Sequence, residues 1–279
     1  MRAIYTFGGK PAQRNLTLPD MRAAKAEGRK LVQANAMEAA EAEAVEQAGI
    51  DILSVTSTKF EEARTAAPHI YTIATIGAAH IVSEEEVLRE AFRVATAGAD
   101  AIYTIRSLKV VEMLAREGLS VQGHAGLVPR KSIATGGLRA MGRTAAEAMA
   151  ILDDVRRLED AGAVAVELEC VAAEAARLIS RATPLVTHSI GSGWGGDVIF
   201  LFTADVCGDT PNPPRHARAF GNLLRLRKEI EAERLSALSA FAGAVRDGAF
   251  PSPAEVVGMA RGEQERLMEA LDRRQPFHQ

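Results

Sequence analysis

The chain has 279 residues and a formal net charge of −3, with 47% hydrophobic and 25% charged residues. It shows no long single-sign charge run, no signal peptide, and no stretch of about 18 apolar residues that could span a bilayer. We therefore expect one cytoplasmic domain over residues 1–279, without nucleic-acid or membrane partners, because α/β barrels reach this length as a single unit.

Short β-branched runs alternate with helical stretches rich in Ala, Glu and Arg from residue 30 onward. This alternation is typical of repeated βα units and a parallel sheet. Eight parallel strands favour closure into an α/β fold of the (β/α)8 TIM-barrel type, with the site at the carboxyl ends of the strands. The predicted strands are residues 30–34, 51–55, 70–76, 101–105, 119–122, 164–168, 184–187 and 198–201.

The helices between these strands have recognisable boundaries. Helices are predicted over residues 37–48 and 144–161, and Ser83 with Glu86 forms a capping box at the start of another. An Ala-Gly turn precedes three of the strands, where glycine supplies the left-handed end of the preceding helix. These glycines are Gly49, Gly98 and Gly162.

The pattern turns helical after residue 205. A polar, Pro-rich link at residues 210–214 precedes helices predicted over residues 216–245 and 252–271. We therefore interpret residues 213–279 as a helical C-terminal extension of the barrel. Extensions of this kind often pack against a neighbouring subunit, so we expect a homo-oligomer.

Four motifs occur in a fixed order along the chain: GHAGLVP at 123–129, GGLRAMGRT at 136–144, VELECV at 166–171 and VRDGAFPS at 245–252. With them the chain resembles the ketopantoate hydroxymethyltransferase (3-methyl-2-oxobutanoate hydroxymethyltransferase) family of the phosphoenolpyruvate mutase/isocitrate lyase superfamily, over nearly its whole length. The resemblance implies a (β/α)8 barrel, commonly oligomeric, that makes or breaks a C–C bond next to the carbonyl of an oxo acid or related carboxylate through an enolate. It also implies methylenetetrahydrofolate as a co-substrate.

The resemblance breaks where the family binds Mg2+. The family's two metal-binding aspartates align with Ser57 and Thr75, and its glutamate after the fourth strand aligns with Ile105. Mg2+ prefers anionic oxygen ligands, which hydroxyl and alkyl groups do not supply. We therefore expect a divergent enzyme that works without the family's Mg2+ site.

Three residues are predicted to carry catalysis. Glu169 matches the family's general base, and burial in the barrel mouth would raise its pKa toward the range useful for proton abstraction. His124 matches a histidine that holds a substrate oxygen, and Tyr103, which replaces a lysine, could donate a hydrogen bond to a developing oxyanion. Substrate binding is predicted for Ser57, Thr58, Thr75, Arg106, His80, His188, Gly191 and Ser192.

Two alternatives remain open from the sequence. His80, His124, His188 and Glu169 would offer imidazole and carboxylate ligands suited to Zn2+, Fe2+ or Mn2+, as in a transition-metal hydrolase or lyase. The loss of several polar family residues also leaves open a non-catalytic relative that binds a ligand or stabilises an oligomer of a related barrel.

Overall fold

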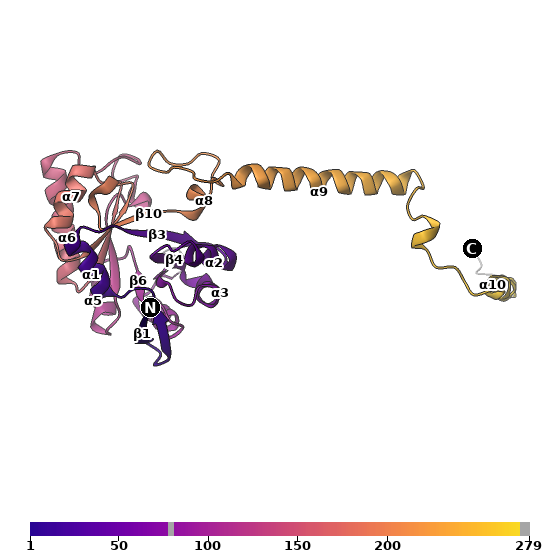
Figure 1. Ribbon diagram of the computed structural model, residues 1–279, viewed down its shortest axis with the longest axis horizontal. Coiled ribbons are helices and arrows are strands. Elements are labelled where there is room, and N and C mark those ends of the chain that lie inside the picture. Colours follow the sequence, from indigo (N-terminus) through magenta and orange to yellow (C-terminus); the bar gives the residue numbers. More distant parts are fainter. Residues whose placement is uncertain (78–80, 274–279) are drawn as a thin grey trace. The chain divides into compact units, whose positions relative to one another are not determined.

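The computed structural model describes residues 1–77 and 81–273 and divides the chain into two units, Met1–Asn222 and Leu223–Gln279. The first unit contains a barrel of strands with helices around it (Figure 1). The barrel is closed, and its neighbouring strands pair in parallel in the order β10-β3-β4-β5-β6-β7-β8-β9. The predicted (β/α)8 fold is confirmed. Its strands are β3 (Leu31–Ala36), β4 (Ile52–Thr56), β5 (Tyr71–Thr75), β6 (Ala101–Tyr103), β7 (Val121–Gly126), β8 (Ala165–Glu169), β9 (Val186–Ile190) and β10 (Val198–Leu201).

The largest extensions beyond the predicted strand limits are in β7 and β9. β7 continues to Gly126 and β9 to Ile190, so His124 and His188 lie within these strands rather than at their ends. Gly123 lies inside β7, and a Cβ there would lie 2.5 Å from a methyl group of Leu158 on the covering helix. The glycine therefore marks close packing of helix against strand.

The helices that surround the barrel begin and end close to their predicted limits. Ser83 accepts a hydrogen bond from the Glu86 N–H in the expected capping box, and the three predicted turn glycines all have positive φ. The segment between the second and third barrel strands holds a helix of only seven residues. The helices of this unit are α1 (Leu18–Glu27), α2 (Ala39–Gln47), α3 (Phe60–Ala66), α4 (Glu84–Thr96), α5 (Leu108–Arg116), α6 (Ala145–Asp160), α7 (Ala173–Arg181) and α8 (Thr203–Val206), with short 3-10 turns η1 (Ser57–Lys59), η2 (Pro129–Lys131) and η3 (Gly193–Gly195).

The interior of the barrel is apolar at the amino-terminal ends of the strands. Leu16, just before α1, and Met21, in its first turns, pack there against inward-facing residues that include Leu31, Ile52 and Val186. A second apolar core lies between the strands and the helices α4 to α7. The polar residues that face the barrel interior lie toward the carboxyl ends of the strands instead.

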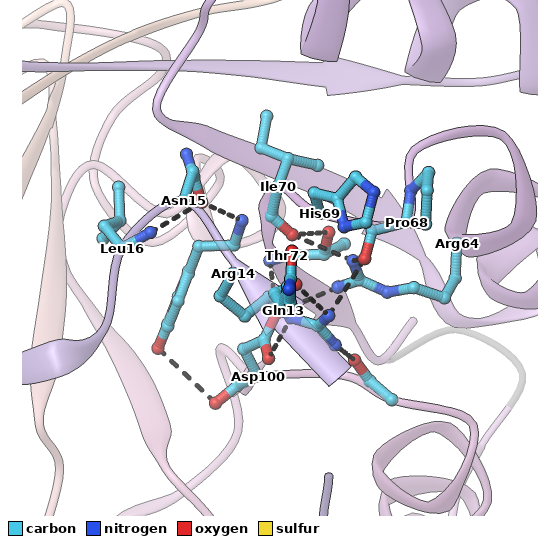
Figure 2. A network of polar contacts seen from close by, with 12 residues as sticks. Gln13, Arg14, Asn15, Leu16, Arg64, Pro68, His69, Ile70, Thr72 and Asp100 are labelled. Carbon is cyan, nitrogen blue, oxygen red and sulfur yellow. Dashed lines mark hydrogen bonds and ion pairs between the residues drawn. The ribbon is translucent and has the colours of Figure 1, made fainter. Parts of the chain in front are cut away.

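A buried ion cluster ties the amino-terminal hairpin, β1 (Arg2–Tyr5) and β2 (Pro11–Arg14), to the barrel. Both carboxylate oxygens of Asp100 accept from Arg14 Nε, at 2.8 and 2.9 Å, and one of them also accepts from Arg64 at 2.9 Å and from the Thr72 N–H at 2.9 Å (Figure 2). The two guanidinium groups also donate to backbone carbonyls, among them that of Pro68. The sequence did not predict this hairpin or its anchor.

The second unit contains α9 (Leu223–Arg246), the turn η4 (Pro253–Glu255) and α10 (Glu263–Asp272). The prediction of a helix from residue 216 was wrong, because the N–H groups of Phe220 and Gly221 donate to the Val206 carbonyl and hold that segment to the barrel unit. The helix predicted over residues 252–271 is interrupted before α10, which begins after Gly262 with a left-handed φ of 80°. Among the described helices, none is long and apolar enough to cross a membrane.

Candidate active site

Four polar side chains meet at the carboxyl end of the barrel. Tyr103 on β6, His124 on β7, and Glu167 and Glu169 on β8 come from three neighbouring strands, and His124 pairs in register with Glu167. Glu167 and Glu169 are two residues apart on one strand, so both side chains point to the same, inner face. One ring nitrogen of His124 and one carboxylate oxygen of each glutamate all lie within 4.8 Å of one another.

Hydrogen bonds within this cluster define the charge of His124. Its Nε2 lies 2.6 Å from the Leu127 carbonyl oxygen, which only accepts, so Nε2 carries a proton. Its Nδ1 lies 2.9 Å from the Tyr103 hydroxyl, which donates its one proton to Glu167 at 2.8 Å. Nδ1 therefore also acts as a donor, and His124 is an imidazolium ion.

Electrostatics agree with this assignment. Burial lowers the pKa of His124, but the hydrogen bond and the charge of Glu167 outweigh burial, so the net effect raises the pKa. Burial and the charge of Glu167 raise the pKa of Tyr103 beyond its usual range, which keeps the phenol protonated as a donor. The cluster is thus a buried cation linked through a phenol to a carboxylate.

Glu169 is the more accessible of the two glutamates. Its Oε2 lies 3.8 Å from His124 Nε2, and burial raises the pKa of Glu169 to about 7, although the charge of His124 opposes the shift. The residue that follows, Cys170, has a left-handed φ of 51°. The turn is held on both sides, because the Cys170 N–H donates to Ile190 and its carbonyl accepts from Met141, each at 2.8 Å. The carboxyl group of Glu169 is therefore a base suited to neutral pH on a fixed strand end.

A cavity of 310 Å³ opens above the cluster at the barrel mouth. Its lining combines Tyr103, Glu167 and Glu169 with hydroxyl groups from β4 and β5 and with two aromatic rings at the end of β10. Its other lining residues include Asn35, Ser54, Thr56, Thr75, Phe200 and Phe202. This volume suits a small carboxylate rather than a large ligand.

The predicted binding residues divide between this cavity and other places. Thr75 lines the cavity, whereas Gly191 and Ser192 line a neighbouring one. Ser57 lies instead beside α4, where its side chain bonds Glu90 and its carbonyl accepts from Arg93 at 2.6 Å. The lining hydroxyl from this part of the chain is Thr56, because the backbone turns into η1 at Ser57.

Two further predicted residues, Thr58 and Arg106, make their contacts outside the cluster. Thr58 lies 3.4 Å from the Thr56 hydroxyl. The guanidinium of Arg106 donates to the carbonyls of Ile81, at 2.6 Å, and Val82, so it is engaged by the loop before α4. His80 lies outside the described residues.

His188 belongs to a separate buried network that the sequence did not reveal. Gln33 Nε2 donates to the Ser54 hydroxyl at 2.5 Å, so Gln33 Oε1 is left to accept from His188 Nδ1, also at 2.5 Å. Burial lowers the pKa of His188 to about 4. His188 is therefore a neutral hydrogen-bond donor inside the barrel, and it is connected to the cluster by its in-register pairing with Glu167 and by the charge of that carboxylate, which opposes the fall in its pKa.

The donor set fits a metal ion poorly as it stands. The described residues that could hold a metal together are His124, Glu167 and Glu169. Both ring nitrogens of His124 already carry protons in hydrogen bonds, so neither offers a lone pair to a cation. The arrangement is instead that of an acid–base site.

Sequence comparison finds that the chain is similar to hydroxymethyltransferases. The sequence model of ketopantoate hydroxymethyltransferase matches residues 60–253. The 3-methyl-2-oxobutanoate hydroxymethyltransferase of Hyperthermus butylicus is 31% identical over 282 residues, which cover 92% of this chain and 96% of that protein. The Pyrococcus furiosus protein of the same name is 40% identical over 175 residues, which cover 61% of this chain and 59% of that one.

Solved structures show a likeness in fold. 2,3-Dimethylmalate lyase, a member of the phosphoenolpyruvate mutase/isocitrate lyase superfamily, superposes with a TM-score of 0.50 and 15% identity, covering 91% of this chain and 93% of that chain. At this level of identity the likeness concerns the barrel architecture.

Proposed function

Since the chain belongs to the ketopantoate hydroxymethyltransferase family and is thus an enzyme of the C–C bond transferase and lyase kind, we propose that it acts on a small 2-oxo acid or related carboxylate through an enolate. The observation that carries this proposal is the pairing of Glu169, whose pKa is raised to about 7, with a buried imidazolium ion at the mouth of the barrel. A base and a positive charge side by side are what enolate formation requires.

Glu169 is the general base in this proposal. Its carboxylate takes the proton from the carbon next to the substrate carbonyl, and the electron pair of that C–H bond moves to the carbonyl oxygen. Because Glu169 lines the mouth cavity and titrates near neutrality, it is both ionised often enough and basic enough for this step.

Tyr103 and His124 stabilise the resulting oxyanion. The Tyr103 hydroxyl, which lines the cavity, turns from Glu167 to donate to the enolate oxygen. Glu167 then keeps His124 Nδ1, 3.3 Å away, as its partner. His124 thereby positions the phenol and supplies positive charge from behind it, rather than touching the substrate as its place in the motif suggests.

This chemistry is proposed to proceed without the Mg2+ site that the resemblance implies for the family. The support is chemical, since hydroxyl and alkyl groups occupy the aligned positions and the imidazolium ion supplies positive charge beside the developing oxyanion. Methylenetetrahydrofolate as the co-substrate, a homo-oligomeric assembly and a cytoplasmic location likewise remain proposals. Binding of a folate analogue would test the first of these.

Proton exchange tests the proposed reaction. When the protein is incubated with a panel of 2-oxo acids in D2O, NMR should show loss of the signal of the proton next to the carbonyl. The exchange rate should rise with pH through about 7 and level off above it, because only the ionised form of Glu169 accepts a proton. A panel without exchange at any pH, or a rate that falls as the pH rises through 7, contradicts the assignment.

Tyr103→Phe should slow exchange by about 10- to 100-fold. The ring remains in place, but the hydrogen bond to the enolate oxygen is lost, as are the hydroxyl's contacts with His124 and Glu167. Tyr5→Phe is a matched control on the exposed amino-terminal hairpin and should leave the rate unchanged. Equal rates for Tyr103→Phe and the wild-type protein would remove Tyr103 from the oxyanion site.

A further inference from the structure

The charge of the mouth cavity opposes an anionic substrate. Glu167 and Glu169 line it, and none of its described lining residues is a lysine or an arginine. The His124 imidazolium ion lies 3.3 Å from Glu167 and offsets the charge of one carboxylate, but it is not among the lining residues. A 2-oxo acid enters as an anion, and like charges repel more strongly where water is partly excluded. Binding its carboxylate therefore calls for a cation close to the mouth.

The loop after β7 carries a cation to this place. Pro129 lines the mouth cavity and also the neighbouring one, as Glu169 does. Arg130 follows Pro129 in the turn η2. The start of this loop is fixed to the cluster, because the Leu127 N–H donates to the Glu169 carbonyl at 2.9 Å and the Leu127 carbonyl accepts from His124 Nε2. The backbone of Arg130 thus lies at the rim of the mouth.

The guanidinium group of Arg130 is available to a ligand. Arg130 is exposed, and within residues 1–77 and 81–273 no hydrogen bond or ion pair engages its side chain. Its charge nevertheless reaches the site. Burial is the largest cause of the raised pKa of Tyr103, and the charge of Arg130 opposes that rise. Arg130 is therefore an unpaired cation near the phenol that lines the cavity.

Two other cations that follow the barrel strands are already engaged. Arg106, which the sequence predicted as a binding residue, donates to the carbonyls of Ile81 and Val82. Lys59, which follows β4, pairs with Glu62 at 3.2 Å. Arg130 differs from both, because its donors are free within the part of the chain that the structure describes.

We propose that Arg130 recognises the carboxylate of the substrate through its fork of guanidinium donors and thereby makes the site selective for an oxo acid over a neutral ketone. The inference rests on the proposed function, in which the mouth cavity holds the oxo acid. With the carboxylate held at the rim by Arg130, the substrate carbonyl lies deeper, toward the Tyr103 hydroxyl, and the adjacent carbon faces Glu169. Arg130 is thus a residue for substrate specificity that makes no contact with the reacting atoms.

Binding of two matched ligands tests this inference. In calorimetric titrations the wild-type protein should bind 2-oxobutanoate more tightly than neutral 2-oxobutanamide. Arg130→Gln should weaken binding of the anion about tenfold and leave that of the amide unchanged, since only the carboxylate forms charge-assisted hydrogen bonds with the guanidinium group. Arg130→Lys keeps the charge but loses the fork, so its loss of affinity should be smaller. Lys131→Gln, the next exposed residue of the same turn, is the matched control and should bind both ligands as the wild-type protein does.

Proton exchange supplies a second readout. Arg130→Gln should raise the KM for 2-oxobutanoate about tenfold and change kcat by less than about twofold, the pattern expected when an interaction is equally strong in the ground state and the transition state. Unchanged affinity for the anion in Arg130→Gln, or an equal loss for anion and amide, would overturn the proposal. Binding requires no proton transfer, so anion selectivity that depends on Arg130 supports the inference even if no exchange occurs and the proposed function fails. Exchange in a protein that binds the anion independently of Arg130 would keep the proposed function and remove this role of Arg130.

Discussion

Glu169→Gln is expected to reduce proton exchange and any C–C bond turnover by about 10²- to 10⁴-fold, the usual contribution of a general base. The amide keeps the shape of the side chain and its place between the two cavities but cannot accept the substrate proton. Exchange of a 2-oxo acid in D2O, measured at pH 8, gives the ratio directly. Glu117→Gln, on the exposed end of α5, is the matched control and should behave as the wild-type protein does.

The same substitution should stabilise the protein at high pH. The pKa of Glu169 is about 7 in the folded protein and lower in the unfolded chain, so the folded state binds the proton more tightly. The contribution of the protonated Glu169 side chain to the free energy of unfolding is fully present at low pH and is lost as the pH rises through 7. Glu169→Gln should therefore melt at a higher temperature than the wild-type protein at pH 8, with a smaller difference at pH 4. Full exchange activity in a folded Glu169→Gln variant would exclude Glu169 as the base.

Asp100→Ala should destabilise the barrel unit by about 3–5 kcal/mol, the usual effect of removing one partner of a buried ion pair. The loss would remove the shared ion-pair partner of Arg14 and Arg64, whose side chains are only 3% and 11% exposed (Figure 2). Burial already lowers the pKa of Arg64 to about 10 against the opposing charges of Asp100 and Glu46, and the substitution would remove the larger of these two charges. Urea unfolding followed by circular dichroism measures the change.

One further variant separates charge from shape in this cluster, and a second serves as a surface control. Asp100→Asn keeps an acceptor oxygen but not the charge, so the stability of this variant should lie between the stabilities of Asp100→Ala and the wild-type protein. Asp153→Ala, on the exposed face of α6, should change stability by less than about 0.5 kcal/mol. Equal losses for Asp100→Ala and Asp153→Ala would mean that the cluster does not anchor the hairpin.

The barrel could be predicted because its pattern repeats. The βα units share a short apolar strand followed by a helix, three of the strands follow an Ala-Gly turn, and all eight predicted strands occur in the structure. The amino-terminal hairpin has no such repetition, since its short strands pair only with each other. The start of α9 could not be predicted from local sequence, because it depends on hydrogen bonds from Phe220 and Gly221 to the carbonyl of Val206, which is distant in the chain.

The site was predictable where it depended on strand parity and motif. Glu169 and His124 lie in recognisable motifs and meet in space as their strand positions indicate. The contact of Ser57 with α4 was not predictable, because the change from strand to 3-10 turn at that residue ends the alternation of side chains. Tyr103 as the bridge between His124 and Glu167 depends on distances across three strands, which no local pattern encodes.

The measurement that tests the central claim most directly is proton exchange on 2-oxo acids in D2O by wild-type protein freed of metal and held in chelator. The proposed site, with Glu169 as base and the His124 imidazolium as the source of positive charge, predicts exchange at pH 8 that persists in chelator and does not increase when Mg2+ is added. Exchange that disappears in chelator and returns with Mg2+ would contradict it.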